Sequence, residues 1–188
     1  MKVSAELIAE CKRNKRKAQF ELYKVCYAFM MQICLRYNPV DADAHAALNE
    51  SFLKVYTKID QYNEHVPFAL WIRRITINTC IDHFRKRKTE LYASFQNIDD
   101  GPIASISHIS NDADLSLDAE ALRAMIRQLP AVSQQVFNLV ILDGYPYEEV
   151  AELLDITVAT CRWHVHFSRK TLQEQLVEVS SESKSKAV

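Results

Sequence analysis

Apolar residues recur at every third or fourth position in three runs along the first half of the chain, which is the spacing of amphipathic helices. The runs cover about residues 4–36, 41–59 and 68–87, and they are separated by Asn38-Pro39 and by the polar loop DQYNEHVP. Asp41 or Asp43 can cap the second run. The buried stripe expected on this second run consists of Leu48, Phe52, Val55 and Tyr56.

A second helical block is expected from about residue 118 to residue 178. Within it, Val136, Phe137, Val140 and Ile141 form one apolar stripe. Asp143-Gly144 ends that helix. A short helix over 147–154, a tight turn at Asp155-Ile156 and a longer helix that Thr157 can cap then follow. This order, with the small Ala151 where the helices cross, is typical of a helix-turn-helix, and Asp155 tolerates the left-handed φ of such a turn.

Between the two blocks the periodicity stops. Residues 94–117 contain Gly-Pro, serines and aspartates, and no Lys or Arg occurs between Thr89 and Arg123. We interpret this segment as a flexible acidic linker. The scarcity of glycine, with only two in the chain, also favours an all-α protein over one rich in hairpin turns. The predicted organisation is therefore two small helical domains, 1–93 and 118–178, joined by the linker 94–117 and followed by a tail, 179–188.

Composition narrows the function classes. The net charge is −1, but the basic runs KRNKRK and RKRK precede the acidic segment. No apolar run approaches the ~20 residues of a membrane span, and no secretory signal opens the chain, so a cytoplasmic protein is expected. The five cysteines form no CxxC pair, so we expect buried thiols without a zinc site. No nucleophile motif or P-loop occurs, and neither enzymatic activity nor a cofactor is expected.

The stretch ATCRWHVHFSRK lies on the second helix of the helix-turn-helix. Helical geometry directs Cys161, Val165, Ser168 and Leu172 to the core, and it directs to the other side Arg162, Trp163, His166, Arg169 and Lys170. His164 and His166 are about 200° apart around the helix and cannot share a metal ion. A merely solvated face would explain the cations but not Trp163. A DNA-reading face explains both.

The third helix of the first block carries a polar stripe that consists of Arg74, Asn78, Asp82 and Arg85. The run RKRK closes this stripe, and the loop that starts at Tyr62 precedes it. Cations, amides and an aromatic ring are the side chains that hold unstacked bases. An ordinary solvated surface remains the alternative on this segment alone.

Taken together, these motifs resemble the extracytoplasmic-function sigma factors of bacterial RNA polymerase. The resemblance rests on CKRNKRKAQFELYKVCY, on DAHAALNESFLKVY, on FALWIRRITINTCIDHFRKRK with its W-x-x-R-I-x-x-N-x-x-x-D-x-x-R pattern, and on the second block from RQLP to QEQL. The wording of CLRY, VFNL, GYPYEEVAELL and SRKTLQ most resembles members from Bacteroidetes-type bacteria. The second domain would then be a helix-turn-helix of the winged-helix-like DNA-binding superfamily.

The resemblance implies a role for each domain. The first domain would dock on the β′ clamp helices of core RNA polymerase through Asp43, Asn49, Glu50 and Phe52. It would also capture the −10 element of promoter DNA with Lys54, Tyr62, Asn63, Glu64, His65, Arg73, Arg74, Asn78, Arg85, Lys86 and Arg87. The second domain, near the β flap, would read the −35 element with Thr160, Arg162, Trp163, His166, Arg169 and Lys170.

Three further expectations accompany these roles. The unusual Trp163 and His164 would set the promoter preference. An anti-sigma factor is the expected regulatory partner, and no part of the chain is expected to insert into a membrane. Two alternatives stay open, namely a helix-turn-helix regulator that acts without polymerase and a sigma-like chain that only binds other proteins.

Overall fold

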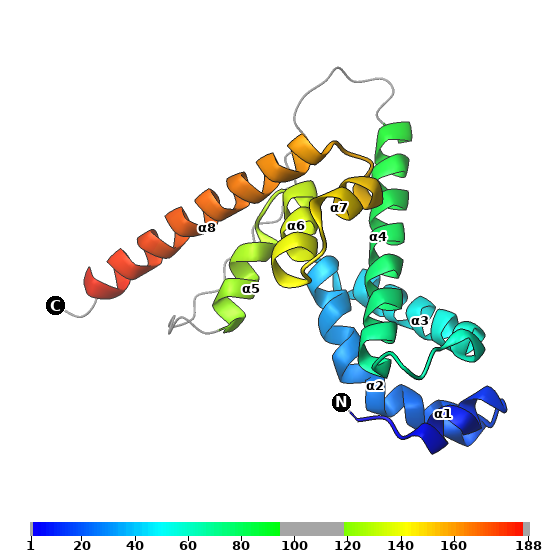
Figure 1. Cartoon of the computed structure of the whole chain (residues 1–188). Helices are drawn as coiled ribbons and strands as arrows, with labels where there is room; N and C mark the ends of the chain where they lie inside the picture. The colour runs from blue at the N-terminus through cyan, green and yellow to red at the C-terminus, as the bar shows by residue number, and fades with distance from the viewer. Residues whose placement is uncertain (1, 95–118, 186–188) are drawn as a thin grey trace. The chain divides into compact units, whose positions relative to one another are not determined.

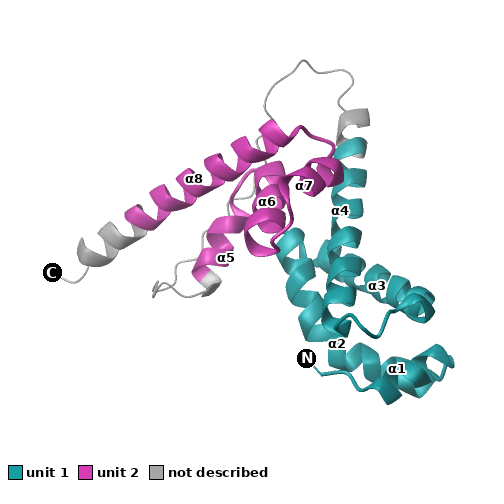
Figure 2. Ribbon diagram, viewed as in Figure 1, with its two compact units in different colours: residues 1–96 teal, residues 97–188 magenta. Residues whose placement is uncertain are grey.

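The computed structural model describes residues 2–94 and 119–185, and every regular element in that part of the chain is a helix (Figure 1). The chain divides into two compact units, unit 1 (residues 1–96) and unit 2 (residues 97–188), shown in Figure 2. Of the predicted acidic linker, residues 95–117 lie outside the described residues, and Ser94 belongs to the helix α4 (Phe68–Ser94). The expectation of a tail from residue 179 is wrong for residues 179–185, which continue the helix α8 (Val158–Ser185).

Unit 1 contains α1 (Ala5–Lys12), α2 (Arg16–Tyr37), α3 (Asp41–Lys58), the short 3₁₀ helix η1 (Ile59–Gln61) and α4 (Phe68–Ser94). The continuous helical spacing seen in the sequence from residue 4 to residue 36 is divided between α1 and α2. The break occurs at Asn14, whose φ of +55° lies in the left-handed region that Asn adopts more readily than most residues. Apolar periodicity did not locate this break, because residues 12–17 are all polar and contain no apolar position that could mark it.

The core of unit 1 forms where α2, α3 and α4 pack against one another. Its fully buried side chains include Leu22, Met30, Leu48, Ile72, Ile77 and Ile81. The stripe expected on α3 is confirmed for Leu48, Phe52 and Val55, which are buried, and Tyr56 is half-buried. The predicted aspartate cap is wrong, because Val40 occupies the N-cap position and no side chain caps α3. Asp41 and Asp43 instead lie in the first turn, where they favour the helix dipole.

Unit 2 contains α5 (Ala119–Arg127), α6 (Ala131–Phe137), the π-helical turn η2 (Asn138–Leu142), α7 (Tyr147–Leu154) and α8 (Val158–Ser185). The turn η2 was not anticipated from the sequence. A π-helical turn adds one residue per turn and rotates the residues that follow it. As a result Leu139 is fully buried, whereas Val140, expected in the buried stripe, is only half-buried.

Gly144, with φ +73°, follows η2 and allows the chain to reverse before α7, as expected from the Asp-Gly pair. The helix α8 packs against α5, α6 and α7. One side of the core contains Met125, Ile126, Leu129, Phe137 and Leu172. Around the helix-turn-helix, the buried side chains are Val150, Ala151, Leu154, Cys161 and Val165. This packing fixes which face of α8 remains open to solvent.

Candidate nucleic-acid interfaces

The turn between α7 and α8 sets the start of the predicted recognition helix. Asp155 has φ +53°, which confirms the left-handed conformation expected there. The backbone N–H of Ile156 donates to the carbonyl of Ala151 at 3.0 Å. Thr157 Oγ1 accepts a hydrogen bond of 3.0 Å from the backbone N–H of Thr160, so Thr157 caps α8 as predicted. Thr160 itself is half-buried, and its hydroxyl lies 2.8 Å from that of Thr157.

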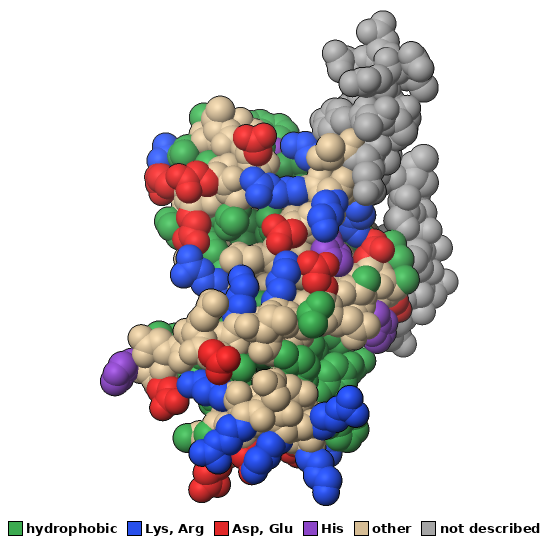
Figure 3. Space-filling view, turned by 90° about the vertical axis from the view of Figure 1, so that its right-hand side faces the viewer, with side chains coloured by type: hydrophobic (Ala, Val, Ile, Leu, Met, Phe, Trp, Pro, Cys, Tyr) green, Lys and Arg blue, Asp and Glu red, His purple; other side chains and the backbone are tan. Residues whose placement is uncertain are grey.

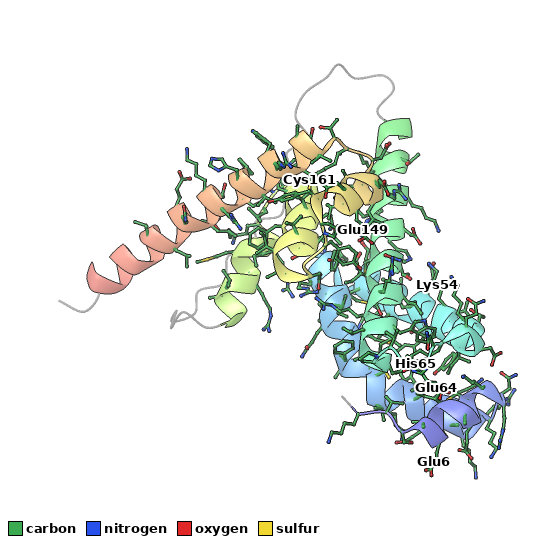
Figure 4. All side chains as sticks on the ribbon, in the orientation of Figure 1. Glu6, Lys54, Glu64, His65, Glu149 and Cys161 are labelled. Atoms are coloured by element: carbon green, nitrogen blue, oxygen red, sulfur yellow. The ribbon has the colours of Figure 1, made fainter. Side chains whose placement is uncertain are left out.

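The two predicted faces of α8 are confirmed. Cys161, Val165, Ser168 and Leu172 are all buried. The exposed face contains Arg162, Trp163, His166, Arg169 and Lys170. Figure 4 shows Cys161, the first of the buried set, on α8. A helix that is anchored on one side and presents cations and an indole on the other has the composition of a DNA-contacting surface.

The cations on this face are only lightly engaged within the protein. The Arg162 guanidinium lies over the ring of Tyr147 on α7, 5.7 Å from its centroid. Lys170 Nζ lies 3.9 Å from Glu174, and both side chains are well exposed, so water screens this pair. The charges therefore remain available to phosphate oxygens. Tyr147 was not singled out from the sequence, because its contact with Arg162 depends on how α7 and α8 cross.

Trp163 and its two ring neighbours form an ordered aromatic group. The Trp163 and Phe167 rings are stacked, with centroids 5.2 Å apart and planes 12° apart. The His164 ring meets Trp163 edge-on at 4.9 Å. His164 Nδ1 and Ser133 Oγ on α6 share a hydrogen bond of 2.9 Å, and burial lowers the His164 pKa. His164 therefore faces the interior of unit 2 rather than the exposed surface on which a direct effect on promoter preference would depend.

In unit 1, the loop between η1 and α4 is held by its own side chains. Tyr62 is only 8% exposed, and its ring packs against Phe68 and Trp71 at 5.1 and 5.2 Å. Its hydroxyl donates to the Val66 carbonyl at 2.6 Å. Asn63 Oδ1 accepts a 3.0 Å hydrogen bond from the backbone N–H of His65. The expected stacking of a base on Tyr62 is therefore not available in this conformation, and Tyr62 instead supports the loop.

The exposed part of the loop lies next to the start of the chain. Glu64 forms an ion pair of 3.4 Å with Lys12 of α1, and His65 is exposed beside it (Figure 4). The exposed cations Arg13, Arg16 and Lys17 belong to the same basic run as Lys12. Figure 3 shows that Lys and Arg side chains gather at the α1 end of unit 1. The loop is thus bordered by positive charge that the sequence did not connect with it.

The polar stripe predicted on α4 is divided between solvent and the protein interior. Arg74, Arg85 and Lys86 are exposed, whereas Arg73 and Asn78 are half-buried. Arg87 donates hydrogen bonds to Asp43 of α3 and, at 3.1 Å, to Asn38 Oδ1 after α2. Arg87 thus joins three segments of unit 1, and its predicted contact with DNA stays a prediction. The sequence did not predict these contacts, because Arg87 is more than 40 residues away from both partners.

A charged network joins α3 and α4. Glu50 lies 2.7 Å from His83 Nε2 and 2.9 Å from Lys54 Nζ, and Lys54 also donates to Asp82 at 3.1 Å. The hydrogen bond from His83, followed by that from Lys54, lowers the Glu50 pKa to about 2. Burial opposes protonation of Lys54, but hydrogen bonds to Glu50 and Asp82 outweigh it and raise the Lys54 pKa. Lys54, predicted to hold an extruded base, is thus engaged within the protein (Figure 4).

The residues predicted to bind polymerase differ in their exposure. Asn49 is exposed, Asp43 and Glu50 are half-buried in the ion pairs above, and Phe52 is 3% exposed. Phe52 packs against Tyr23 at 4.4 Å, so its predicted contact with a partner is wrong and its place in the buried stripe is confirmed. Leu53, which the sequence analysis did not name, is exposed one residue later.

Other sites find no support in the described part of the chain. All five cysteines are buried and free, as expected. Within residues 2–94 and 119–185, no three His, Cys, Asp or Glu side chains converge as metal ligands. No helix among these residues is both long enough and apolar enough to cross a membrane.

Comparisons with curated proteins and solved structures reveal relatives along most of the chain. It is 26% identical over 176 residues to the ECF RNA polymerase sigma factor SigW of Bacillus subtilis, covering 90% of this chain and 94% of that protein. It is 27% identical over 180 residues to the ECF RNA polymerase sigma-E factor of Escherichia coli, covering 90% and 92% respectively. The fold is similar to that of the sigma factor RpoE from Bartonella quintana, solved with the anti-sigma factor NepR, with a TM-score of 0.50, 19% identity and coverage of 83% and 94%.

Two family matches coincide with the two units. Residues 22–90 match Sigma-70 region 2, which includes most of α2, all of α3 and most of α4. Residues 119–172 match Sigma-70 region 4, which includes α5 to α7 and the first half of α8. Because these matches together cover about two thirds of the chain, in the order region 2 and then region 4, the chain belongs to the sigma-70 family.

Proposed function

We propose that the chain is an extracytoplasmic-function sigma factor that docks on core RNA polymerase and directs promoter-specific initiation in the cytoplasm. The observation that carries this proposal is the exposed cationic face of α8, which follows a capped helix-turn-helix within the region 4 match. The protein would act as an initiation factor with no chemistry of its own. The curated relatives are named ECF sigma factors, and this chain is similar to them over nearly their full length, which supports the same function.

Unit 2 would place α8 in the major groove of the −35 element. Arg162, His166, Arg169 and Lys170 would contact phosphates or base edges, and Trp163 would contact an apolar base edge. Thr160, which belongs to the cap of α8, would approach the backbone near the helix N-terminus. A helix that enters the groove with its N-terminal residues is the usual docking mode of a helix-turn-helix.

Unit 1 would capture the −10 element with the loop from Asn63 to His65. The exposed His65, together with Asn63 and Glu64, would meet an extruded base, while Tyr62 and Lys54 would support the loop and the adjacent helices from within. The cations near this surface would hold the phosphate backbone, and they are Arg73, Arg74, Arg85 and Lys86. Asn78, on the same helix as these cations, would help to hold the extruded base. Electrostatic contacts of this kind make affinity depend on salt.

The surface for polymerase would lie on α3. Asn49 is exposed, and Leu53 is exposed one turn further along. The half-buried Asp43 and Glu50 lie on the same helix, and a basic clamp helix of the β′ subunit would have to compete for them with Arg87, Lys54 and His83. Unit 2 would contact the β flap. We extend the proposal to an anti-sigma factor as regulatory partner, since a structurally similar sigma factor was solved with one. We also propose an origin in Bacteroidetes-type bacteria, which rests on the motifs CLRY, VFNL, GYPYEEVAELL and SRKTLQ.

The first test is to mix the purified chain with core RNA polymerase, follow co-elution, and transcribe promoter fragments selected by the holoenzyme. Stable binding and discrete start sites support the proposal. A folded chain that binds a palindromic DNA site without polymerase would indicate a regulator instead. A folded chain that binds neither polymerase nor DNA would indicate a sigma-like chain that only binds other proteins.

A further inference from the structure

The exposed face of α8 contains an apolar surface between its cations. Trp163 remains 58% exposed although its ring is stacked on Phe167, the residue one turn later. We call these two stacked rings the aromatic plate. Trp163 belongs to the large apolar side chains of unit 2 that stay exposed, and an exposed apolar surface with a polar rim is typical of an interaction site. The plate therefore requires an explanation beyond packing.

The plate is held in place from the inside of the unit. The His164 ring meets the edge of Trp163 at 4.9 Å and is itself anchored by the 2.9 Å hydrogen bond to Ser133 Oγ. Ser133 is buried in α6, so the position of the indole is tied to the core through two side chains. An ordered aromatic ring loses little conformational entropy when a ligand covers it. This arrangement is suited to recognition.

The surroundings of the plate identify its ligand. Arg162, His166 and Lys170 lie on the same exposed face, which complements the phosphates of DNA rather than an apolar protein surface. In the major groove only one base presents an apolar group, the C5 methyl of thymine.

We propose that the aromatic plate is a thymine-methyl reader, and that its Trp163 indole selects one A·T pair in the −35 element. Phe167 and His164 are positioning residues that fix the Trp163 indole. This inference rests on the proposed function, since it requires α8 to enter the major groove. It adds the identity of the base group that is read and two residues that govern the reading.

The test replaces each thymine of a selected −35 element by deoxyuridine, which lacks only the methyl group. Holoenzyme assembled from core RNA polymerase and the full chain is titrated with each duplex. Loss of one buried methyl group should weaken binding roughly four-fold at one position, and substitution elsewhere should have no effect. The Trp163→Ala holoenzyme should bind the thymine and deoxyuridine duplexes equally.

Further variants separate methyl reading from other roles. Phe167→Ala should reduce the thymine preference, and Phe167→Tyr, which keeps the stacking, should restore it. Trp163→Ala should leave the slope of affinity against salt unchanged, because an apolar contact releases no counterions, whereas Arg169→Ala should reduce it by about one. Val177→Ala is the control, since Val177 is exposed on α8 beyond the region 4 match and should change neither quantity.

The outcomes are distinct. A thymine preference that disappears in Trp163→Ala supports the proposal. Equal binding of thymine and deoxyuridine duplexes by the wild-type holoenzyme would overturn it while leaving the sigma-factor function intact. A Trp163→Ala variant that loses polymerase binding, with no effect of deoxyuridine, would mean that the plate contacts protein. A wild-type chain that never forms a promoter-binding holoenzyme would overturn the proposed function and, with it, this inference.

Discussion

Acidification should weaken unit 1 through Glu50, the carboxylate that joins α3 to α4. In the folded protein, hydrogen bonds from His83 and then Lys54 hold the Glu50 pKa at about 2, against an ordinary value of 4.5. A carboxyl whose pKa is lower in the folded state stabilises the fold above its unfolded pKa. This stabilisation is complete above about pH 4.5 and is lost as the pH falls toward 2.

The magnitude follows from the two pKa values. Their separation corresponds to about 3.4 kcal/mol at roughly 1.36 kcal/mol per pH unit. The Glu50 side chain is 34% exposed, so solvent screening reduces this to about 1–2 kcal/mol. By pH 3, roughly half or more of the contribution should be lost, because the unfolded carboxyl is then protonated and the folded one begins to be.

The assay is urea unfolding of the full chain followed by tryptophan fluorescence. The chain contains two tryptophans, and in a Trp163→Phe background the remaining Trp71 reports on unit 1 alone. Glu50→Gln should lower the free energy of unfolding of unit 1 by about 1–2 kcal/mol at pH 7, and by less than half of that at pH 3.

Glu21→Gln is the matched control. Glu21 pairs with Lys24 at 2.7 Å, but both side chains are about half exposed, so little change is expected at either pH. An effect of Glu50→Gln that is equally large at pH 7 and pH 3 would refute the reasoning, since it would show that the carboxylate charge is not what stabilises the fold.

Three other changes have defined outcomes. Phe52→Ala should destabilise unit 1 by about 3–5 kcal/mol in the same urea assay, because it empties a buried site, while the exposed Asn49→Ala should leave stability unchanged and weaken co-elution with polymerase. Asp155→Ala should destabilise unit 2 by about 1 kcal/mol in thermal unfolding, and Asp155→Gly should not, because only the alanine is strained at φ +53°. Tyr147→Leu should reduce discrimination against single-base changes in the −35 element roughly two- to five-fold, and Tyr147→Phe should preserve it, since the ring beneath Arg162 is retained.

The helix-turn-helix was well predicted from the sequence, because its signals are local. The 3.6-residue period correctly separated the buried Cys161 and Val165 from the exposed Arg162 and Trp163. The cap at Thr157 and the left-handed Asp155 also depend on neighbouring residues only. The exception was η2, since a π-helical turn changes the register by a single residue and apolar spacing tolerates that change.

The first candidate site was less predictable, because its side chains find partners far along the chain. Lys54 and Asp82 are 28 residues apart, and Arg87 and Asp43 are 44 residues apart. The residue spacing within α3 or α4 does not predict which charged side chain will form an ion pair with the other helix. Phe52 met two sequence criteria at once, a place in an apolar stripe and a place in a partner-binding segment, and only packing against Tyr23 decided between them.

Because all five cysteines are buried, their reaction with a thiol reagent can report the opening of each unit. Burial raises the pKa of Cys26 to about 12 and also raises that of Cys161, so neither thiol reacts readily while its unit is closed. Four cysteines belong to unit 1, and Cys161 alone belongs to unit 2. A thiol reagent can add up to four mass increments to unit 1 and one to unit 2. The rates of these additions would therefore report how often each unit opens, without any substitution in the chain. A ligand that stabilises one unit in its closed form should slow thiol modification in that unit only.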